Sequence, residues 1–164
     1  MRAHPKSILL MGAALAMSPG CHRPETPASV INMSDPSRAN QLIYGFYDVE
    51  MHAWRWTAGK FKVGLKPPAD STHRGARLRL DLFIPDAQIQ GLGPMTLTAT
   101  AAGSPLEPET FSKPGTYVYW RDVRAELLDS NILPVDFHFD RYWPWDVKGR
   151  ELGAVVSAVA LLSK

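Results

Sequence analysis

The sequence predicts an all-β fold, an antiparallel β-sandwich of the jelly-roll kind that follows a signal segment and a flexible tether. Apolar and polar residues alternate in several short segments, which is the pattern of half-buried strands. Turn-forming residues separate these segments at intervals of about 8–15 residues, as in a sandwich or a jelly roll. The chain of 164 residues has no internal repeat and no long amphipathic helical pattern, and leaves room for one domain.

Residues 1–20 have the composition of a secretory signal. Arg2 and Lys6 make the start basic, no acidic residue accompanies them, and residues 8–17 form an uncharged apolar run. This run is too short to span a bilayer, because a spanning helix needs roughly 20 apolar residues. A buried N-terminal helix is the alternative interpretation.

Cys21 is the only cysteine of the chain, and it follows Ser18, Pro19 and Gly20 directly. This arrangement resembles a bacterial lipoprotein signal, in which the cysteine becomes the lipidated first residue of the mature protein. Gly20 matches the small residue of that family, whereas Ser18 stands where the family usually has leucine. The resemblance implies a lipid anchor at Cys21 in the membrane of the cell envelope, and His22 favours the outer membrane. Ordinary signal cleavage and no cleavage are the alternatives.

Residues 21–40 are predicted to form the flexible tether, and residues 41–164 the sandwich domain. The tether contains Pro24, Pro27 and Pro36 among Ser and Thr residues and has little apolar periodicity. Without residues 1–20 the 18 basic residues fall to 16, which equals the number of acidic residues. A neutral surface of mixed charge offers no electrostatic basis for binding nucleic acid.

The first strands of the domain are predicted from alternation that ends at a proline. Residues 61–65 alternate apolar with basic or small side chains, and Pro67 follows closely. Residues 77–84 alternate most strictly. Their aliphatic side chains share one face, while charged side chains and Phe83 share the other. Pro85 ends this second strand.

Four further segments complete the predicted sandwich. Residues 95–101, 116–121 and 135–139 alternate in the same way, and residues 124–128 are expected to form a short helical turn or an irregular crossing. Residues 152–162 fit either a helix or a strand. We expect a strand, because a final strand completes such a sheet.

Two motifs at opposite ends of the domain resemble a group of bacterial envelope β-sandwich proteins and modules. The opening motif is Gly45-Phe46-Tyr47, then Glu50 and Trp54-Arg55-Trp56-Thr57, and the closing motif is Arg150-Glu151-Leu152-Gly153. The resemblance covers residues 44–162, and some members accompany surface-polysaccharide genes or glycosyltransferases. It implies a sandwich fold and assigns no catalytic residue.

The end motifs form the first candidate cluster, made of Glu50, Trp54, Arg55, Trp56, Arg150 and Glu151. Its predicted ligand-binding residues are Trp54, Arg55, Arg150 and Glu151. Arginine binds carboxylates or sugar hydroxyls, and tryptophan faces stack on sugars. If the first and last strands pair, we expect Arg55 to meet Glu151, or Glu50 to meet Arg150. The alternative role is a salt-bridge clasp that closes the sheet and sets the strand register.

The second candidate cluster is Tyr142-Trp143-Pro144-Trp145, of which Trp143 and Trp145 are the predicted ligand-binding residues. Three aromatic side chains around a proline are costly to expose without a purpose. We interpret them as a platform on which carbohydrate stacks. The alternative is a loop that folds its rings over the open end of the core.

The sequence contains no signature of an enzyme. It has no Gly-x-Ser-x-Gly elbow, no His-Glu-x-x-His motif and no glycine-rich phosphate loop. Glu50 and Asp146 could serve glycoside hydrolysis only at a fixed separation, which a sequence does not give. Asp136, His138 and Asp140 are spaced about 7 Å apart on a strand, so we expect a solvated face there. No catalytic residue, metal or cofactor is predicted.

These observations predict an exported, lipid-anchored protein of the cell envelope whose non-catalytic sandwich domain binds carbohydrate. The expected partners are the membrane, through Cys21, and an envelope polysaccharide or protein. A structural or assembly protein that contacts another envelope protein through edge strands is the first alternative. A weak glycoside hydrolase is the second.

Overall fold

The computed structural model describes residues 26–164 of the chain. The predicted signal segment and Cys21 lie outside the described residues. Within the described part, no helix is both long and apolar enough to cross a membrane.

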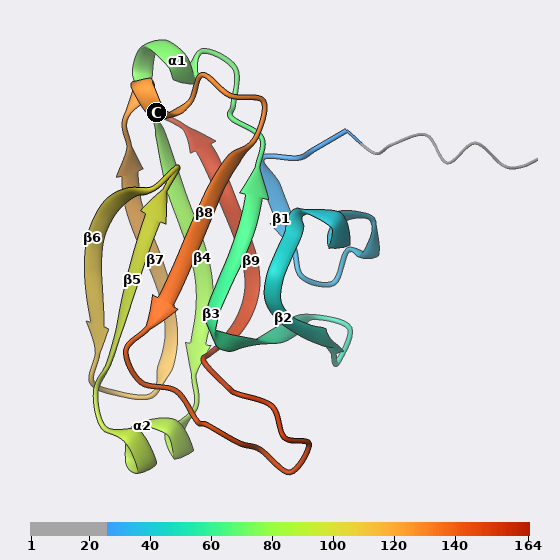
Figure 1. The fold of residues 1–164 in the computed structure, drawn as a ribbon, viewed down its shortest axis with the longest axis vertical. Coiled ribbons are helices and arrows are strands. Elements are labelled where there is room, and N and C mark those ends of the chain that lie inside the picture. The colour runs from blue at the N-terminus through green and yellow to red at the C-terminus, as the bar shows by residue number, and fades with distance from the viewer. Residues whose placement is uncertain (1–25) are drawn as a thin grey trace, which may run out of the picture.

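The described chain folds into antiparallel strands that form one continuous sheet, folded over into two layers (Figure 1). The strands are β1 (Val30–Asn32), β2 (Leu42–Glu50), β3 (Trp54–Leu65), β4 (Ala76–Ile84), β5 (Met95–Ala101), β6 (Ser104–Phe111), β7 (Gly115–Val123), β8 (Leu133–Phe139) and β9 (Val155–Ser163). Short helices connect them, namely η1 (Pro36–Gln41), α1 (Ser71–Arg74), α2 (Asp86–Leu92) and η2 (Ala125–Leu127). The predicted all-β sandwich is therefore confirmed.

Strand β3 joins the two layers. The order along the sheet is β6-β5-β8-β3-β9-β4-β7. Strand β1 pairs with the later part of β9 on the same side as β3, and β2 pairs with the side of β3 that faces away from β8 and β9. Residues 60–65 of β3 pair with β8 in one layer, whereas Arg55 and Trp56 pair with β9 in the other. The beginning of β3 is thus fixed beside the beginning of β9.

The core lies between the two layers. Phe61 of β3 stacks on Phe137 of β8 with ring centroids 4.8 Å apart, and both side chains are buried. Tyr119 of β7 is buried as well, and its hydroxyl donates a hydrogen bond of 2.8 Å to the carbonyl of Glu107 in β6. Each large apolar side chain buried in this way stabilises the fold by roughly 1.5–3 kcal/mol.

The strands predicted from alternation are present at the expected places. Residues 61–65, 77–84, 95–101, 116–121 and 135–139 lie in β3, β4, β5, β7 and β8 in that order. The last apolar segment forms strand β9, as expected, and the predicted turn after β7 contains the short helix η2.

The domain begins earlier than predicted, because part of the expected tether belongs to the sandwich. Residues 21–40 were expected to be flexible, yet Val30–Asn32 forms strand β1 and pairs with β9. Ile31 and Met33 are buried in the core. A strand of three residues is too short to leave a periodic pattern, so composition alone suggested a linker.

Strand β6 and helix α2 were not predicted either. Strand β6 contains Pro105 and Pro108, which cannot donate to a ladder and are tolerated at the edge of a sheet.

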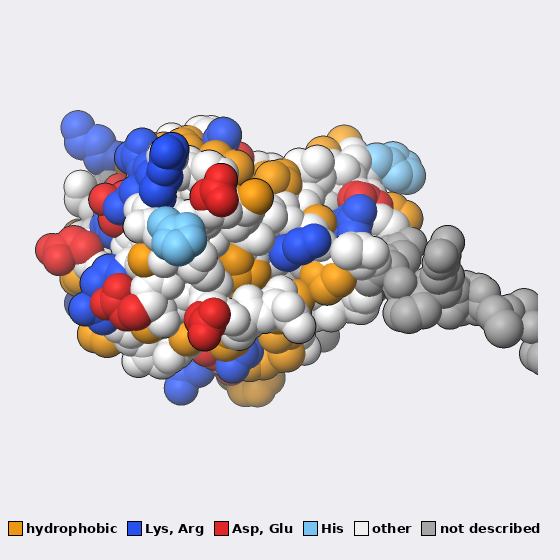
Figure 2. Space-filling view, turned by 90° about the horizontal axis from the view of Figure 1, so that it is seen from above, with side chains coloured by type: hydrophobic (Ala, Val, Ile, Leu, Met, Phe, Trp, Pro, Cys, Tyr) orange, Lys and Arg blue, Asp and Glu red, His pale blue; other side chains and the backbone are white. Residues whose placement is uncertain are grey.

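At the opposite end of the sandwich from α2, where α1 lies, basic and acidic side chains stand side by side on the surface (Figure 2). This end shows no large field of one charge.

Candidate functional site

The candidate site lies at the end of the sandwich that carries α2 (Figure 1). Strands β3 and β9 begin there and strand β4 ends there, and a loop from Asp140 to Ala154 joins β8 to β9 at the same place. Chain segments far apart in sequence therefore meet at this end.

A row of cross-strand neighbours forms one side of the site. Trp56 of β3 pairs with Val155 of β9, Val155 pairs with Phe83 of β4, and Phe83 pairs with Thr116 of β7. Side chains of alternate residues share a face, and the buried residues Leu82 and Ile84 take the core face of β4. The row therefore lies on the outer face of the layer, where Phe83 is 41% exposed.

Two neighbouring hollows follow this row. One measures about 550 Å³ and is lined by Trp54, Trp56, Phe83 and Val155, among others. The second measures about 430 Å³ and is lined by Trp143, Trp145, Val147 and Leu152, among others. Trp56 and Pro85 belong to both hollows, so we treat the two together as the aromatic groove.

The tryptophans of the groove come from two distant parts of the chain. Trp54 and Trp56 stand edge to face, with ring centroids 6.5 Å apart and an interplanar angle of 84°. Trp143 and Trp145 come from the loop before β9 and are 39% and 70% exposed. The three predicted ligand-binding tryptophans, Trp54, Trp143 and Trp145, are thus brought to one site.

Hydrogen bonds and close packing position this loop. The backbones of Trp143 and Leu152 exchange two hydrogen bonds of 2.9 and 2.8 Å. Gln88 of α2 donates to the carbonyls of Leu152 and Gly153, both at 2.8 Å. The ring of Trp143 lies so close to Gly91 of α2 that a Cβ there would stand 2.5 Å from it. The loop is therefore tied to α2 and not folded over the core.

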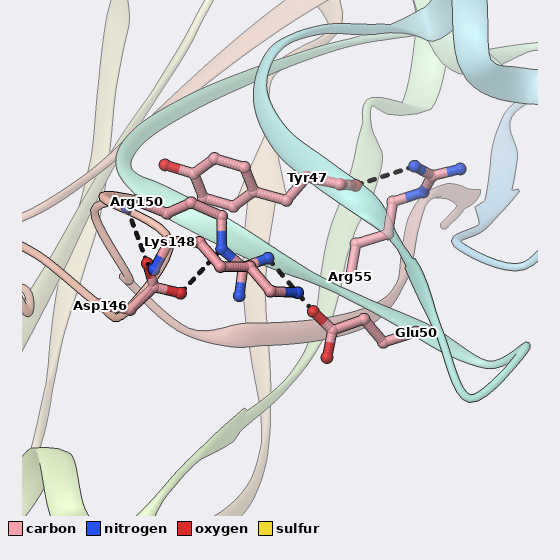
Figure 3. A network of polar contacts seen from close by, with 6 residues as sticks. All are labelled: Tyr47, Glu50, Arg55, Asp146, Lys148 and Arg150. Carbon is pink, nitrogen blue, oxygen red and sulfur yellow. Dashed lines mark hydrogen bonds and ion pairs between the residues drawn. The ribbon is translucent and has the colours of Figure 1, made fainter.

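A cluster that we call the arginine clasp holds the rest of the loop (Figure 3). Its members are Arg150, Asp146 and Glu50. The guanidinium of Arg150 binds Asp146 at 2.8 Å and Glu50 at 3.2 Å, and lies 5.1 Å from the centre of the Tyr47 ring. This confirms the expected contact between Glu50 and Arg150 and links β2 to the loop before β9.

Asp146 accepts further hydrogen bonds from the loop backbone. The N–H groups of Lys148 and Arg150 both donate to Asp146 Oδ1 at 2.8 Å. These bonds, above all the one from Arg150, lower the pKa of the Asp146 carboxyl below its ordinary 3.8. Asp146 is therefore a stable anion that shapes the turn.

Arg55 and Glu151 do not meet, in contrast to the alternative pairing considered from the sequence. Arg55 instead donates to the carbonyls of Met33 at 3.0 Å and Tyr47 at 2.8 Å, on the side away from the clasp (Figure 3). The negative charge of Glu151 acts on Tyr47 without an ion pair to Arg55. Burial and this charge together raise the pKa of the Tyr47 hydroxyl. Arg55 thus fastens the N-terminal segment and β2 to β3.

Glu50 and Asp146, the two acids considered for glycoside hydrolysis, are not arranged as a catalytic pair. A general acid for glycoside hydrolysis needs a raised pKa and a partner carboxylate across the scissile bond. The pKa of Asp146 is lowered, and both Asp146 and Glu50 bind the same arginine. Their shared chemistry is that of a structural ion-pair network.

The polar face of β8 is organised by neighbouring side chains. Asp136 accepts a hydrogen bond of 3.0 Å from Tyr44 and pairs with Lys62 at 3.1 Å. Across residues 26–164, no group of three His, Cys, Asp or Glu side chains is placed to hold a metal ion.

Sequence reasoning left several residues of the groove out of the predicted site. Trp56 belonged to the opening motif but not to the predicted ligand-binding residues, and Phe83, Pro85 and Gln88 were not considered. Phe83 did carry a signal, because it is the one apolar residue on the polar face of its strand. The role of Gln88 depends on α2, which the sequence pattern did not predict.

Comparisons with known proteins found similarities among solved structures alone. No protein-family model and no curated protein matches the chain. A family 35 carbohydrate-binding module from Clostridium thermocellum is similar over 82% of this chain and 98% of that chain, at 9% identity and a TM-score of 0.47. A carbohydrate-binding module described for specific mannan recognition is similar over 84% and 97%, at 11% identity and a TM-score of 0.48.

Proposed function

We propose that this protein is a non-catalytic carbohydrate-binding protein that holds glycan against the aromatic groove. The observation that carries the proposal is the convergence of four tryptophans, from β3 and from the loop before β9, on the two adjoining hollows of the aromatic groove. Indole rings offer large flat apolar faces and a polar N–H, which suits the alternating C–H and hydroxyl surface of a sugar ring.

Exposure of these rings to water supports a binding role. A contiguous apolar surface of this kind is unusual on a monomer unless it binds something. Trp145 and Val147 are the most exposed large apolar side chains of the groove, at 70% and fully exposed. Their positions are nevertheless held by the arginine clasp and by Gln88. A preformed apolar site of this kind loses little entropy when a ligand binds.

A glycan array tests this proposal, with binding to retained glycans then measured by affinity electrophoresis. We expect Trp54→Ala and Trp145→Ala to weaken sharply the retention that the unmodified protein shows. Trp120→Ala is the matched control, because Trp120 lies outside the groove between Arg77 and Arg79, whose guanidinium carbons are 4.9 and 5.4 Å from its ring. Equal retention by all variants, or no retention of any glycan, would contradict the proposal.

We also propose that Cys21 anchors the protein to the cell envelope with the groove directed away from the membrane. The first described residues support this orientation. The carbonyl of Ala28 accepts a hydrogen bond from the N–H of Lys66, just beyond the end of β3. The carbonyl of Ser29 accepts one from the N–H of Leu161, near the end of β9. The chain thus enters the domain at the end opposite the groove.

Metabolic labelling with a radioactive fatty acid tests the anchor. We expect label and detergent-phase partitioning in the unmodified protein and neither in Cys21→Ser. Label that persists in Cys21→Ser, or its absence from both forms, would overturn the anchor while leaving the groove untouched.

A protein partner is the second candidate function, favoured by the free edge of β2. Ile43, Val49 and Met51 are exposed along and just beyond this strand. An unpaired edge can accept a strand from a partner, although register shifts interrupt the pairing of β2 with β3 and make the edge irregular. Crosslinking in intact envelopes distinguishes the two functions, because a stable protein adduct without glycan affinity favours this one.

A further inference from the structure

No basic side chain of the described residues lines the aromatic groove. Among the described residues that line its two halves, the only ionisable side chain is Asp146. Two arginines of the end motifs, Arg150 and Arg55, lie at this end of the sandwich. The first is bound to Asp146 and Glu50, and the second to backbone carbonyls. A carboxylate or phosphate on the ligand would therefore lose its hydration without gaining a counter-charge.

Apart from Asp146, the polar side chains that line the groove are uncharged. Thr116 and Ser157 present exposed hydroxyls in the first half, and Gln88 lies in the wall of the second. Gln88 is only 4% exposed, and both of its donor contacts run to the carbonyls of Leu152 and Gly153. Its Oε1 has no hydrogen-bond partner among the described residues. Because this oxygen is shielded from solvent, the exposed hydroxyls of Thr116 and Ser157 are the uncharged polar groups that a sugar can reach.

The two halves of the groove are comparable in size and in character. Volumes of about 550 and 430 Å³ each lie within the range of sites that hold a small organic ligand. Trp54 and Phe83 line the first half, and Trp143 and Trp145 line the second. Trp56 and Pro85 line both halves. A single sugar can fill one half only, whereas a chain can contact both.

We propose that the aromatic groove binds an uncharged glycan chain, with sugar units in both halves at once. This inference rests on the proposed carbohydrate-binding function and adds the charge and the minimum extent of the ligand. Contacts made by linked units add without a second loss of translational freedom, so affinity rises steeply once the chain reaches both halves.

Calorimetric titration with a length series of neutral oligosaccharides tests the proposal. The series starts at the monosaccharide and is prepared from a polymer that the protein retains. We expect affinity to rise at least about tenfold at the length that spans both halves. Trp54→Ala and Trp145→Ala should each remove this rise while retaining the weak binding of short oligomers, and Trp120→Ala should keep it. Thermal unfolding of each variant confirms that it is folded.

Polymers of matched length that carry uronic acids or amino sugars test the charge. We expect both to bind at least about tenfold more weakly than the neutral chain. Equal affinity for every length would overturn the two-halved site, and preference for a charged polymer would overturn the neutral ligand. Both results would leave carbohydrate binding in place. Failure to bind any glycan would overturn the inference together with the proposed function.

Discussion

The loop before β9 contributes to two neighbouring clusters, the arginine clasp and the aromatic side chains of the groove. The charged groups of the clasp have partners within the protein, whereas the aromatic rings of the groove are exposed to water. In the clasp, Arg150 has Asp146, Glu50 and the Tyr47 ring as partners. In the groove, Trp145 remains 70% exposed. Charged groups that already have internal partners gain little from a ligand, whereas exposed rings gain from losing contact with water. The clasp is thus expected to govern stability and the groove to govern binding.

The largest expected effect is on binding, in Trp145→Ala. Truncation of an aromatic side chain that anchors a ligand costs about 2 kcal/mol or more, so affinity for a retained glycan should fall about 30-fold or more. The free energy of unfolding should change by less than about 0.5 kcal/mol, because the side chain has few internal contacts to lose. Titration calorimetry and urea unfolding measure the two quantities. A large loss of stability with unchanged affinity would reverse the roles of the two clusters.

The next effect is on stability, in Arg150→Ala. Removing the guanidinium leaves Asp146 and Glu50 without their shared partner, so we expect the free energy of unfolding to fall by about 1–2 kcal/mol. Thermal unfolding should begin several degrees lower. Glycan affinity of the folded variant should fall less than in Trp145→Ala. Unchanged stability would show that the clasp does not hold the loop.

The pH dependence of stability and of binding should again distinguish the arginine clasp from the aromatic groove. The pKa of Asp146 is lowered in the folded protein, so its contribution to stability is present above the ordinary carboxyl value of 3.8 and is lost as pH falls through the lower, folded value. Melting temperature against pH should therefore drop more steeply below pH 3.8 in the unmodified protein than in Asp146→Asn. Glycan affinity should stay level between about pH 5 and 8, since no other side chain of the groove titrates. Parallel melting curves for the two proteins would contradict this assignment.

A smaller effect is expected from Gly91→Ala. The added methyl group would meet the Trp143 ring, which is the movable end of a side chain, so the ring shifts and α2 stays in place. We expect affinity to weaken by about threefold, a change of less than 1 kcal/mol, with little change in melting temperature. Asp86→Ala at the exposed start of α2 is the control. A fall in melting temperature without a fall in affinity would place Trp143 in the core and not in the site.

How far the sequence predicted the fold depended on how regular each strand is. Strand β4 alternates without interruption, and its four aliphatic residues are buried as expected. Strand β2 contains Gly45 at φ 78° and pairs with β3 through several register shifts, so no simple period describes it. Gly45 also lies directly against Lys60 and Phe61 of β3, and a Cβ at this position would collide with both.

The candidate site was predicted in its parts but not in its arrangement. Trp54, Trp143 and Trp145 stood out because aromatic residues in short motifs are conspicuous in a sequence. Their convergence depends on β3 crossing from one layer to the other and on α2 meeting the loop, and neither follows from local pattern. The arginines were grouped with them by position in the chain, whereas the structure gives both arginines internal partners.

The five tryptophans of the chain provide the most direct test of the central claim, that the aromatic groove binds glycan. Four of them line the groove, and Trp120 lies outside it on β7. Each indole N–H gives its own signal in a nitrogen-edited NMR spectrum. On titration with a retained neutral oligosaccharide, we predict that the signals of Trp54, Trp56, Trp143 and Trp145 shift while that of Trp120 stays in place. A titration in which only Trp120 shifts, or in which bound glycan moves none of the four, would contradict the account.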